Sequence, residues 1–379
     1  MILKKKIVEV VGPSFHNKGD SLMAYAIEQR LGSRNILAYD SRAQVKPWLW
    51  RPVQALIRRS PRLARSAKYY LAYLLPDRLR LAWRIVNYKD IRAILDCSGF
   101  QYGDQWIKLK LDWRINHYKK IRDAGGKVIM LPQAFGPFRS RVVRERILNV
   151  LKNVDLVYAR DKVSAHHLQE LEISTLQIKT SPDFTNLIPG KKPSDTVLWA
   201  DRVCLVPNAR MVDMTRAEIG NIYIDFLLLC ISSLRKKGLK PVILLHENTD
   251  NQIAQLINDR VEEKLPIIDV NPIESKGILG CCHSVISSRY HALASSLSQG
   301  TPCLGTSWAH KYLGLFEDHG CPECLFESLD SEQEIGKKLL LITDPNQRTM
   351  LAKRIKDNAE LLKQKSMEMW KEVETILNS

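Results

Sequence analysis

The alternation of short apolar runs with helical patterns is the feature that most limits the folds open to this chain. It continues over most of the 379 residues. The runs expected to form strands are KKIVEVV, NILAY, AILDC, KVIML, DLVYA and LQIKT in the first half, and RVCLVP, KPVILL, LPIIDV, HSVISS and TPCLGT in the second. Strands separated by helices pair in parallel through helical crossovers. The sequence therefore predicts an α/β protein with parallel sheets.

One segment interrupts the alternation. Residues 186–201, NLIPGKKPSDTVLWAD, contain two prolines and a glycine and show little periodicity, which is typical of a linker. A chain of this length is expected to form about two domains. We therefore predict two unequal Rossmann-like α/β lobes that face each other across a cleft, one over residues 1–190 and one over residues 200–379.

The two ends of the chain predict different elements. The N-terminus, MILKKKIVEVVG, has basic residues followed by a short apolar run without a small-residue cleavage site, so we expect a first strand rather than a signal peptide. Residues 346–377 carry an amphipathic pattern that predicts one long helix. We expect this helix to pack back across the first lobe.

The composition favours a globular protein of the cytoplasm. Apolar residues make up 45% and charged residues 26%, and no run approaches the roughly 18 apolar residues that span a bilayer. The eight cysteines are scattered, and Cys321 and Cys324 form one CxxC without a second pair at zinc-ribbon spacing. We therefore predict no metal centre.

The positive charge is concentrated in one segment. The net charge is +16, and the segment from Trp48 to Arg92 holds eleven Lys or Arg against two Asp, interleaved with Trp and Tyr. This composition predicts a helical insertion that binds an anionic membrane surface, at the inner face of the membrane. A solvated helical face is the main alternative. A nucleic-acid partner is not expected, because no recognisable motif accompanies the charge.

The loop after the first expected strand carries polar residues and glycine. Ligands of open α/β sheets bind beyond the carboxyl ends of the strands, so such loops are candidate sites. Asp20 is placed to cap a helix that runs to Leu31, and Gly19 would let backbone N–H groups approach an anion or a sugar oxygen. A capped turn without a ligand is the alternative.

Two later strands of the first half also end in polar residues. Gln133 follows KVIML, and Arg160 follows DLVYA just before Asp161, which is expected to begin a helix. An arginine at such a boundary, taken alone, is more often a packing residue than a ligand contact. Both side chains nevertheless stand where an α/β sheet binds its ligands.

The second half places several basic side chains after its strands. These are Arg210, His246 (with Asp250 in the same loop), Arg289, His291 and Lys311. All would project from one edge of one sheet, and guanidinium groups bind carboxylate or phosphate in bidentate geometry. No Asp or Glu lies between Ser287 and Lys311. We therefore expect these cations to bind an anion rather than to form salt bridges.

With these residues the sequence resembles the polysaccharide pyruvyl transferase family. The matching motifs are NKGD, LPQAFGPF, ARDKVSAHHL, the DF of SPDFTN, and SRYHALASSLSQGTPCLGTSWAHK, in the family's order over roughly residues 10 to 320. The last motif is specific and the others are individually weak. CSGFQYGDQW departs from the glycine-rich turn that the family often has. The resemblance implies a fold like that of GT-B glycosyltransferases.

The resemblance also implies an activity. It implies transfer of the enolpyruvyl or pyruvyl group of phosphoenolpyruvate, without a cofactor, onto sugar hydroxyls of a cell-surface or exopolysaccharide glycan, or of its nucleotide- or lipid-linked precursor, with a pyruvate ketal as the expected product. His291 is the candidate general acid, since an imidazole is partly protonated near neutrality. The candidate donor-binding residues are Arg210, Arg289, Lys311, Tyr290 and His246. The candidate acceptor-side residues are Asn17, Gly19, Asp20, Gln133 and Arg160.

Two other functions remain open on the sequence. One is a nucleotide-sugar glycosyltransferase of the same architecture, in which the arginines would hold a diphosphate. The other is a non-catalytic assembly protein at the membrane surface. The joint presence of Arg289, His291 and Lys311 argues against the latter.

Overall fold

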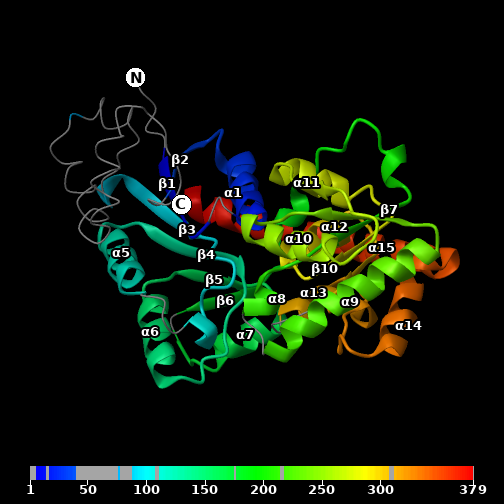
Figure 1. Cartoon of the computed structure of the whole chain (residues 1–379). Coiled ribbons are helices and arrows are strands. Elements are labelled where there is room, and N and C mark those ends of the chain that lie inside the picture. Colours follow the sequence, from blue (N-terminus) through cyan, green and yellow to red (C-terminus); the bar gives the residue numbers. More distant parts are fainter. Residues whose placement is uncertain are drawn as a thin grey trace. The chain divides into compact units, whose positions relative to one another are not determined.

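The computed structural model describes residues 6–13, 17–39, 76, 88–106, 111–174, 176–213, 217–306 and 311–378. The chain divides into two compact units, each with its own parallel sheet (Figure 1). The first unit comprises Met1–Phe15, Ala24–Thr180 and Trp370–Ser379, and the second comprises His16–Met23 and Ser181–Met369. Of the basic aromatic insertion predicted around residues 48–92, all but residues 76 and 88–92 lies outside the described residues.

The sheet of the first unit has six strands in the order β2-β1-β3-β4-β5-β6, and all neighbours are parallel. Its strands are β1 (Lys6–Val11), β2 (Asn35–Tyr39), β3 (Ile91–Asp96), β4 (Lys127–Gln133), β5 (Leu156–Ala159) and β6 (Gln177–Thr180). β3, β4 and β5 are almost continuously buried, as expected for parallel strands covered on both faces.

Amphipathic helices cover this sheet. They are α1 (Lys18–Leu31), α5 (Asp112–Asp123), α6 (Arg141–Leu151) and α7 (Lys162–Gln169), with the 3₁₀ turns η2 (Tyr88–Asp90) and η3 (Asp104–Trp106). α6 shows the pattern, since Val143, Ile147 and Val150 recur at helical spacing and all enter the core. Asp161 caps α7 by accepting from the backbone N–H of Ser164, as predicted.

The C-terminal helix α15 (Pro345–Asn378) finishes in the first unit. Glu372 accepts a hydrogen bond of 2.6 Å from the Tyr158 hydroxyl and pairs with Lys179, while Glu374 pairs with Arg30. The prediction of one long helix that packs back on the first lobe is confirmed.

The sheet of the second unit has five strands in the order β11-β10-β7-β8-β9, again all parallel. Its strands are β7 (Arg202–Val206), β8 (Lys240–Leu244), β9 (Ile267–Ile268), β10 (Ser284–Ser287) and β11 (Cys303–Gly305). After β7 the chain adds β8 and β9 on one side, and then returns to add β10 and β11 on the other. The order therefore reverses between β7 and β10, and α/β sheets bind ligands at such a switch point.

Helices connect the strands of the second unit as well. They are α8 (Arg210–Asp213), α9 (Ala217–Lys236), α10 (Asn251–Asn258), α11 (Pro272–Leu279), α12 (Tyr290–Leu297), α13 (Lys311–Asp318) and α14 (Glu332–Thr343), with η4 (Phe184–Leu187), η5 (Val197–Trp199), η6 (Asn248–Asp250) and η7 (Pro322–Cys324). Every residue of α12 is buried except His291. None of the helices in the described part of the chain is long and apolar enough to span a membrane.

The eleven predicted strands are all strands, so the predicted α/β class with parallel sheets is confirmed. One capping prediction is wrong. Asn17, not Asp20, caps α1, because its Oδ1 accepts from the N–H of Gly19 at 2.8 Å and from that of Asp20. The helix begins at Lys18, and Asp20 lies in its first turn.

Candidate active site

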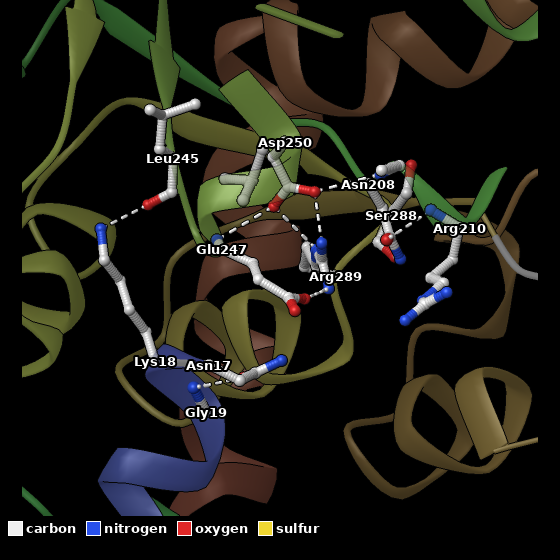
Figure 2. A network of polar contacts seen from close by, with 12 residues as sticks. Asn17, Lys18, Gly19, Asn208, Arg210, Leu245, Glu247, Asp250, Ser288 and Arg289 are labelled. Atoms are coloured by element: carbon white, nitrogen blue, oxygen red, sulfur yellow. Dashed lines mark hydrogen bonds and ion pairs between the residues drawn. The ribbon is translucent and has the colours of Figure 1, made fainter. Parts of the chain in front are cut away.

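Polar side chains gather at the carboxyl edge of the second unit's sheet, around the switch point between β7 and β10. The loop after β7 contributes Asn208 and Arg210, the loop after β8 contributes His246, Glu247 and Asp250, and the loop after β10 contributes Ser288, Arg289 and His291. Figure 2 shows most of these residues together with the first turn of α1. The second unit thus brings the predicted residues Arg210, His246, Arg289 and His291 to one edge.

Arg289 is held by two carboxylates (Figure 2). Its Nε donates to Asp250 Oδ2 at 2.9 Å, its Nη2 pairs with the other Asp250 oxygen, and its Nη1 donates to Glu247 Oε2 at 2.6 Å. The side chain of Arg289 is 8% exposed and that of Asp250 is fully buried. The expectation that Arg289 would not form salt bridges is therefore wrong. The acids lie on the loop after β8, which is distant in sequence but adjacent in the sheet.

Asp250 also accepts hydrogen bonds from groups other than Arg289. Its carboxylate also accepts from the backbone N–H of Ala209 at 3.0 Å and of Glu247 at 3.1 Å. Burial raises the pKa of Asp250, although Arg289 opposes that shift. Asp250 therefore fixes the loops after β7 and β8 and the guanidinium of Arg289 in one arrangement.

Ser288 connects the loop after β10 to the loops after β7 and β11 through hydrogen bonds. Its carbonyl accepts from Asn208 Nδ2 at 2.8 Å and from the Tyr312 hydroxyl at 2.9 Å. Its hydroxyl is bonded to Tyr223 at 2.7 Å and to Thr306 at 2.6 Å. All of these groups are buried or nearly so. The switch point therefore stands on a pre-organised hydrogen-bond network.

His246 is a buried imidazole whose two ring nitrogens have no hydrogen-bond partner among the described residues. Burial lowers its pKa well below the usual value, and the nearby charges of Arg289, His291 and Lys18 lower it further. The ring is therefore neutral at neutral pH. Buried polar atoms in native proteins nearly always find a partner, so His246 is a candidate for contact with a bound ligand or water.

The first turn of α1 belongs to the second unit and meets this edge (Figure 2). Lys18 Nζ donates to the Leu245 carbonyl at 2.6 Å and to Asp269 at 2.7 Å, and Asn17 forms an isolated bridge with Glu247. A Cβ atom on Gly19 would lie 2.1 Å from His291 Nδ1. Glycine is therefore required here because the backbone of α1 approaches the imidazole directly.

Lys311 and Arg210 complete the basic residues of the edge. The Lys311 ammonium lies 5.4 Å from the ring centre of Tyr290 and 5.6 Å from that of Tyr312, which is cation–π geometry. Arg210 begins α8, where its backbone N–H donates to Asn208 Oδ1 at 3.0 Å, and it is half-buried. Arg210 is therefore the more accessible of the two predicted arginines.

Gln133 and Arg160 lie elsewhere, at the carboxyl edge of the first unit's sheet. Gln133 is fully buried and its Nε2 donates to the Asp96 carbonyl at 3.3 Å, and Arg160 is also buried. Asp96, which was not among the predicted site residues, accepts a hydrogen bond from the Tyr118 hydroxyl at 2.6 Å and another from Tyr102. Its place as a charged residue at the carboxyl end of the buried strand β3 was the sequence feature that could have identified it. Asn17, Gly19 and Asp20 therefore lie in a different unit from Gln133 and Arg160.

His291 has a buried acid beside it. Its Nε2 lies 3.5 Å from Asp183 Oδ2, and Asp183 Oδ1 accepts from the N–H and hydroxyl of Thr185 at 3.0 and 2.6 Å. Lys276 Nζ donates to the Thr185 carbonyl at 2.6 Å. Burial lowers the pKa of Lys276 to about 7, which nearby Asp183 partly opposes. Asp183 belongs to the DF of the family motif SPDFTN but was not among the predicted site residues, and neither was Lys276.

The buried Lys276 predicts a pH dependence of stability. A lysine in the unfolded chain titrates near 10.4, so between pH 7 and about 10 the unfolded state binds more protons than the folded state. Stability due to this residue therefore rises with pH across that window, by on the order of a few kcal/mol. The expected result is that the wild type gains stability relative to Lys276→Met from pH 7 to 10 in urea unfolding. A constant difference between the two proteins would contradict the burial argument.

Comparison with known proteins identifies relatives in sequence and in fold. The amylovoran biosynthesis protein AmsJ of Erwinia amylovora is 22% identical over 222 residues, which are 52% of each chain. The chain thus spans about half the length of this curated relative. The Anabaena HepE structure with UDP and glucose matches with a TM-score of 0.59, at 11% identity over 98% of this chain and all of that one.

Two further solved structures are also similar to this chain in fold. UDP-GlcNAc 2-epimerase from Neisseria meningitidis has a TM-score of 0.58 at 12% identity, over 98% of this chain and 100% of that one. MnaA of S. aureus with UDP has a TM-score of 0.57 at 12% identity, over 99% and 97%. These likenesses concern the fold alone, and they confirm the expected GT-B-like α/β fold.

The family is shown by a more specific match. The model of the polysaccharide pyruvyl transferase family matches residues 17–310. That range begins at the cap of α1 and includes the loops after β7, β8 and β10, so it covers the switch point described above. The chain therefore belongs to the polysaccharide pyruvyl transferase family, a family of transferases.

Proposed function

We propose that this protein transfers the pyruvyl group of phosphoenolpyruvate onto sugar hydroxyls of a glycan or its precursor, forming a pyruvate ketal. One observation supports the proposal beyond family membership. His291 is the one residue of α12 that is not buried, and it lies among the basic and polar groups of the switch point, next to the first turn of α1. That position suits a proton donor to a bound anion.

The chemistry needs one proton donor and binding of two anionic groups. The enol phosphate is protonated at its methylene carbon, and positive charge develops at the carbon that bears the phosphate. A sugar hydroxyl attacks this carbon, inorganic phosphate leaves with cleavage of its carbon–oxygen bond, and a second hydroxyl closes the ketal. The two sugar hydroxyls lose two protons in total. One replaces the proton that was given to the methyl group, and the other leaves with phosphate. His291 is the proposed proton donor, a role typically worth about 10²–10⁴-fold in rate.

Arg289 is proposed to contact the donor from a fixed position. A guanidinium has five N–H groups, and three of those of Arg289 are bonded to Asp250 and Glu247. The two carboxylates fix the plane of the group and also offset its charge. The remaining attraction for an anion is therefore assigned to Arg210 and Lys311, and His246 and Tyr290 are proposed to line the same donor site.

Arg210 gives the prediction that tests this assignment. Arg210→Met is expected to raise KM for phosphoenolpyruvate by about 10–100-fold, because a hydrogen bond to a charged group contributes about 1.5–3 kcal/mol. Arg202→Met is the matched control, since Arg202 begins β7 at the opposite edge and lies over the Trp199 ring. Steady-state kinetics of both variants decide. Equal KM values in Arg210→Met and Arg202→Met would remove Arg210 from the donor site.

The acceptor is proposed to be a glycan of the cell-surface or exopolysaccharide type, or its nucleotide- or lipid-linked precursor. The relative named for amylovoran biosynthesis supports a role in polysaccharide biosynthesis. Asn17, Asp20, Gln133 and Arg160 remain the proposed acceptor-side residues, with Gly19 allowing the backbone approach. The basic composition of the segment from Trp48 to Arg92 supports the proposal that the protein binds the cytoplasmic face of a membrane and modifies a lipid-linked acceptor there.

A nucleotide-sugar glycosyltransferase is the second candidate, because the similar structures were solved with UDP or UDP-sugars. Release of inorganic phosphate and thermal stabilisation, each measured with phosphoenolpyruvate and with UDP-glucose, separate the two. The proposed function predicts stabilisation by phosphoenolpyruvate and acceptor-dependent release of phosphate. Stabilisation by UDP-glucose alone would favour the second candidate.

A further inference from the structure

Two buried charges near His291 have no part in the mechanism above. Asp183 caps η4 and is 6% exposed, and Lys276 lies in α11 and is 1% exposed. Removing a charge from water is costly unless a partner compensates it. The contacts of these two residues therefore bear on what they do.

Thr185 links the two charges. Its N–H and hydroxyl both donate to Asp183 Oδ1, at 3.0 and 2.6 Å, and its carbonyl accepts from Lys276 Nζ at 2.6 Å. Oδ1 of Asp183 is thus occupied by Thr185, and Oδ2 is the oxygen that lies 3.5 Å from His291 Nε2. The arrangement directs one carboxylate oxygen at the imidazole and keeps the other fixed.

The opposite edge of the imidazole faces a different element. His291 Nδ1 lies against Gly19 at the start of α1, where any side chain would collide with it. The other groups around the ring are the neutral His246 from the loop after β8 and Arg289, which precedes it on the chain. Lys276 in turn has the charges of Asp183 and of Lys363 on α15 near it. Asp183 is the acid that faces His291 from η4.

We propose that Asp183 is the positioning residue of His291 and that Lys276 tunes it: the carboxylate holds the Nε2 edge and favours the protonated ring, and the lysine ammonium weakens that effect. This inference rests on the proposed function, because it assumes that His291 delivers a proton. A carboxylate that orients an imidazole and stabilises its protonated form is a general device of proton-transferring sites. The proton is then delivered from the Nδ1 edge, beside Gly19.

The two charges predict effects of opposite sign. Asp183→Asn removes the attraction for the imidazole proton while its amide oxygen still accepts from Thr185, so the pKa of His291 falls. Lys276→Met removes a positive charge that opposes Asp183, so the pKa of His291 rises. If the two residues only held η4 in place, both variants would shift the pKa of His291 in the same direction. Lys191→Met is the matched control, since Lys191 pairs with Glu274 on the same helix α11 but is 69% exposed.

The experiment is a pH titration of the full chain labelled with ¹⁵N in histidine, with His291→Gln used to assign the signal. In the wild type we expect the neutral ring to carry its proton on Nε2, a measurement that needs no variant at Asp183. We expect a lower His291 pKa in Asp183→Asn, a higher one in Lys276→Met, and no change in Lys191→Met. An Nδ1-protonated neutral ring, an unchanged titration in Asp183→Asn, or shifts of the same sign would overturn the inference.

Kinetics separate this inference from the proposed function. In the active enzyme, Asp183→Asn should lower kcat at least about 10-fold with KM for phosphoenolpyruvate unchanged, and should move the kcat–pH profile to lower pH. If the wild type transfers no pyruvyl group but the ring titrates as described, the proposed function fails and the contact between Asp183 and His291 stands. If transfer occurs and Asp183→Asn leaves kcat and its pH profile unchanged, the inference fails and the function stands.

Discussion

Asp250→Ala is expected to lower the free energy of unfolding by about 3–5 kcal/mol, the usual cost of removing one partner of a buried ion pair. The carboxylate is fully buried and binds two nitrogens of Arg289. Its loss leaves the Arg289 guanidinium with Glu247 alone, and also leaves the N–H groups of Ala209 and Glu247 without an acceptor. The cost thus combines an uncompensated charge with unsatisfied backbone donors.

An exposed pair provides the control for this experiment. Asp225 pairs with Arg260 at 2.7 Å, with side chains 63% and 52% exposed, so Asp225→Ala should cost no more than about 1 kcal/mol. Urea unfolding of both variants measures the difference. The double variant Asp250→Leu, Arg289→Met should recover part of the loss, since the buried charge is then gone. A cost for Asp250→Ala as small as that of Asp225→Ala would show that the pair contributes little to folding.

His291→Gln is expected to lower kcat by about 10²–10⁴-fold, because glutamine cannot donate a proton to carbon as an imidazolium does. KM for phosphoenolpyruvate should change little, since the anionic groups of the donor are assigned to the arginines and Lys311. Glutamine also retains hydrogen-bonding groups near Asp183, so the loss would report chemistry rather than an empty space. Stopped assays of phosphate release, with saturating donor and acceptor, measure kcat.

The control for His291→Gln is a histidine outside the site. His166 lies on α7 in the first unit, and its side chain is 69% exposed. His166→Gln should leave kcat and KM as they are. If His291→Gln turns over as fast as the wild type while His166→Gln also does, then His291 is not the general acid, and another residue must supply the proton.

The strands could be predicted because parallel strands are buried on both faces and therefore appear as continuous apolar runs. RVCLVP and HSVISS became β7 and β10, and with them came the place of Arg210, Arg289 and His291 at the strand ends. The order of the strands in the sheet could not be predicted from the apolar runs. The switch point therefore emerged only from the pairing of β10 with β7.

The partners of the site residues could not be predicted, because they come from distant parts of the chain. Asp250 and Arg289 are 39 residues apart in sequence, so the absence of acids between Ser287 and Lys311 did not exclude this ion pair. Asp183 and Gly19 come from η4 and α1 and meet His291 only in the folded unit. The wrong cap for α1 has a local cause, since Asn17 and Asp20 are both good capping residues and lie within one turn.

Transfer of labelled carbon from phosphoenolpyruvate tests the central claim most directly. The full chain is incubated with phosphoenolpyruvate labelled with ¹³C at its second carbon and with lipid-linked glycan from a strain that lacks the gene, with His291→Gln run in parallel. The account predicts a ketal carbon signal in the glycan, release of one phosphate for each ketal formed, and neither product with His291→Gln beyond its slow rate. A glycan without label, together with unconsumed phosphoenolpyruvate across such acceptors and their nucleotide-linked forms, would contradict it.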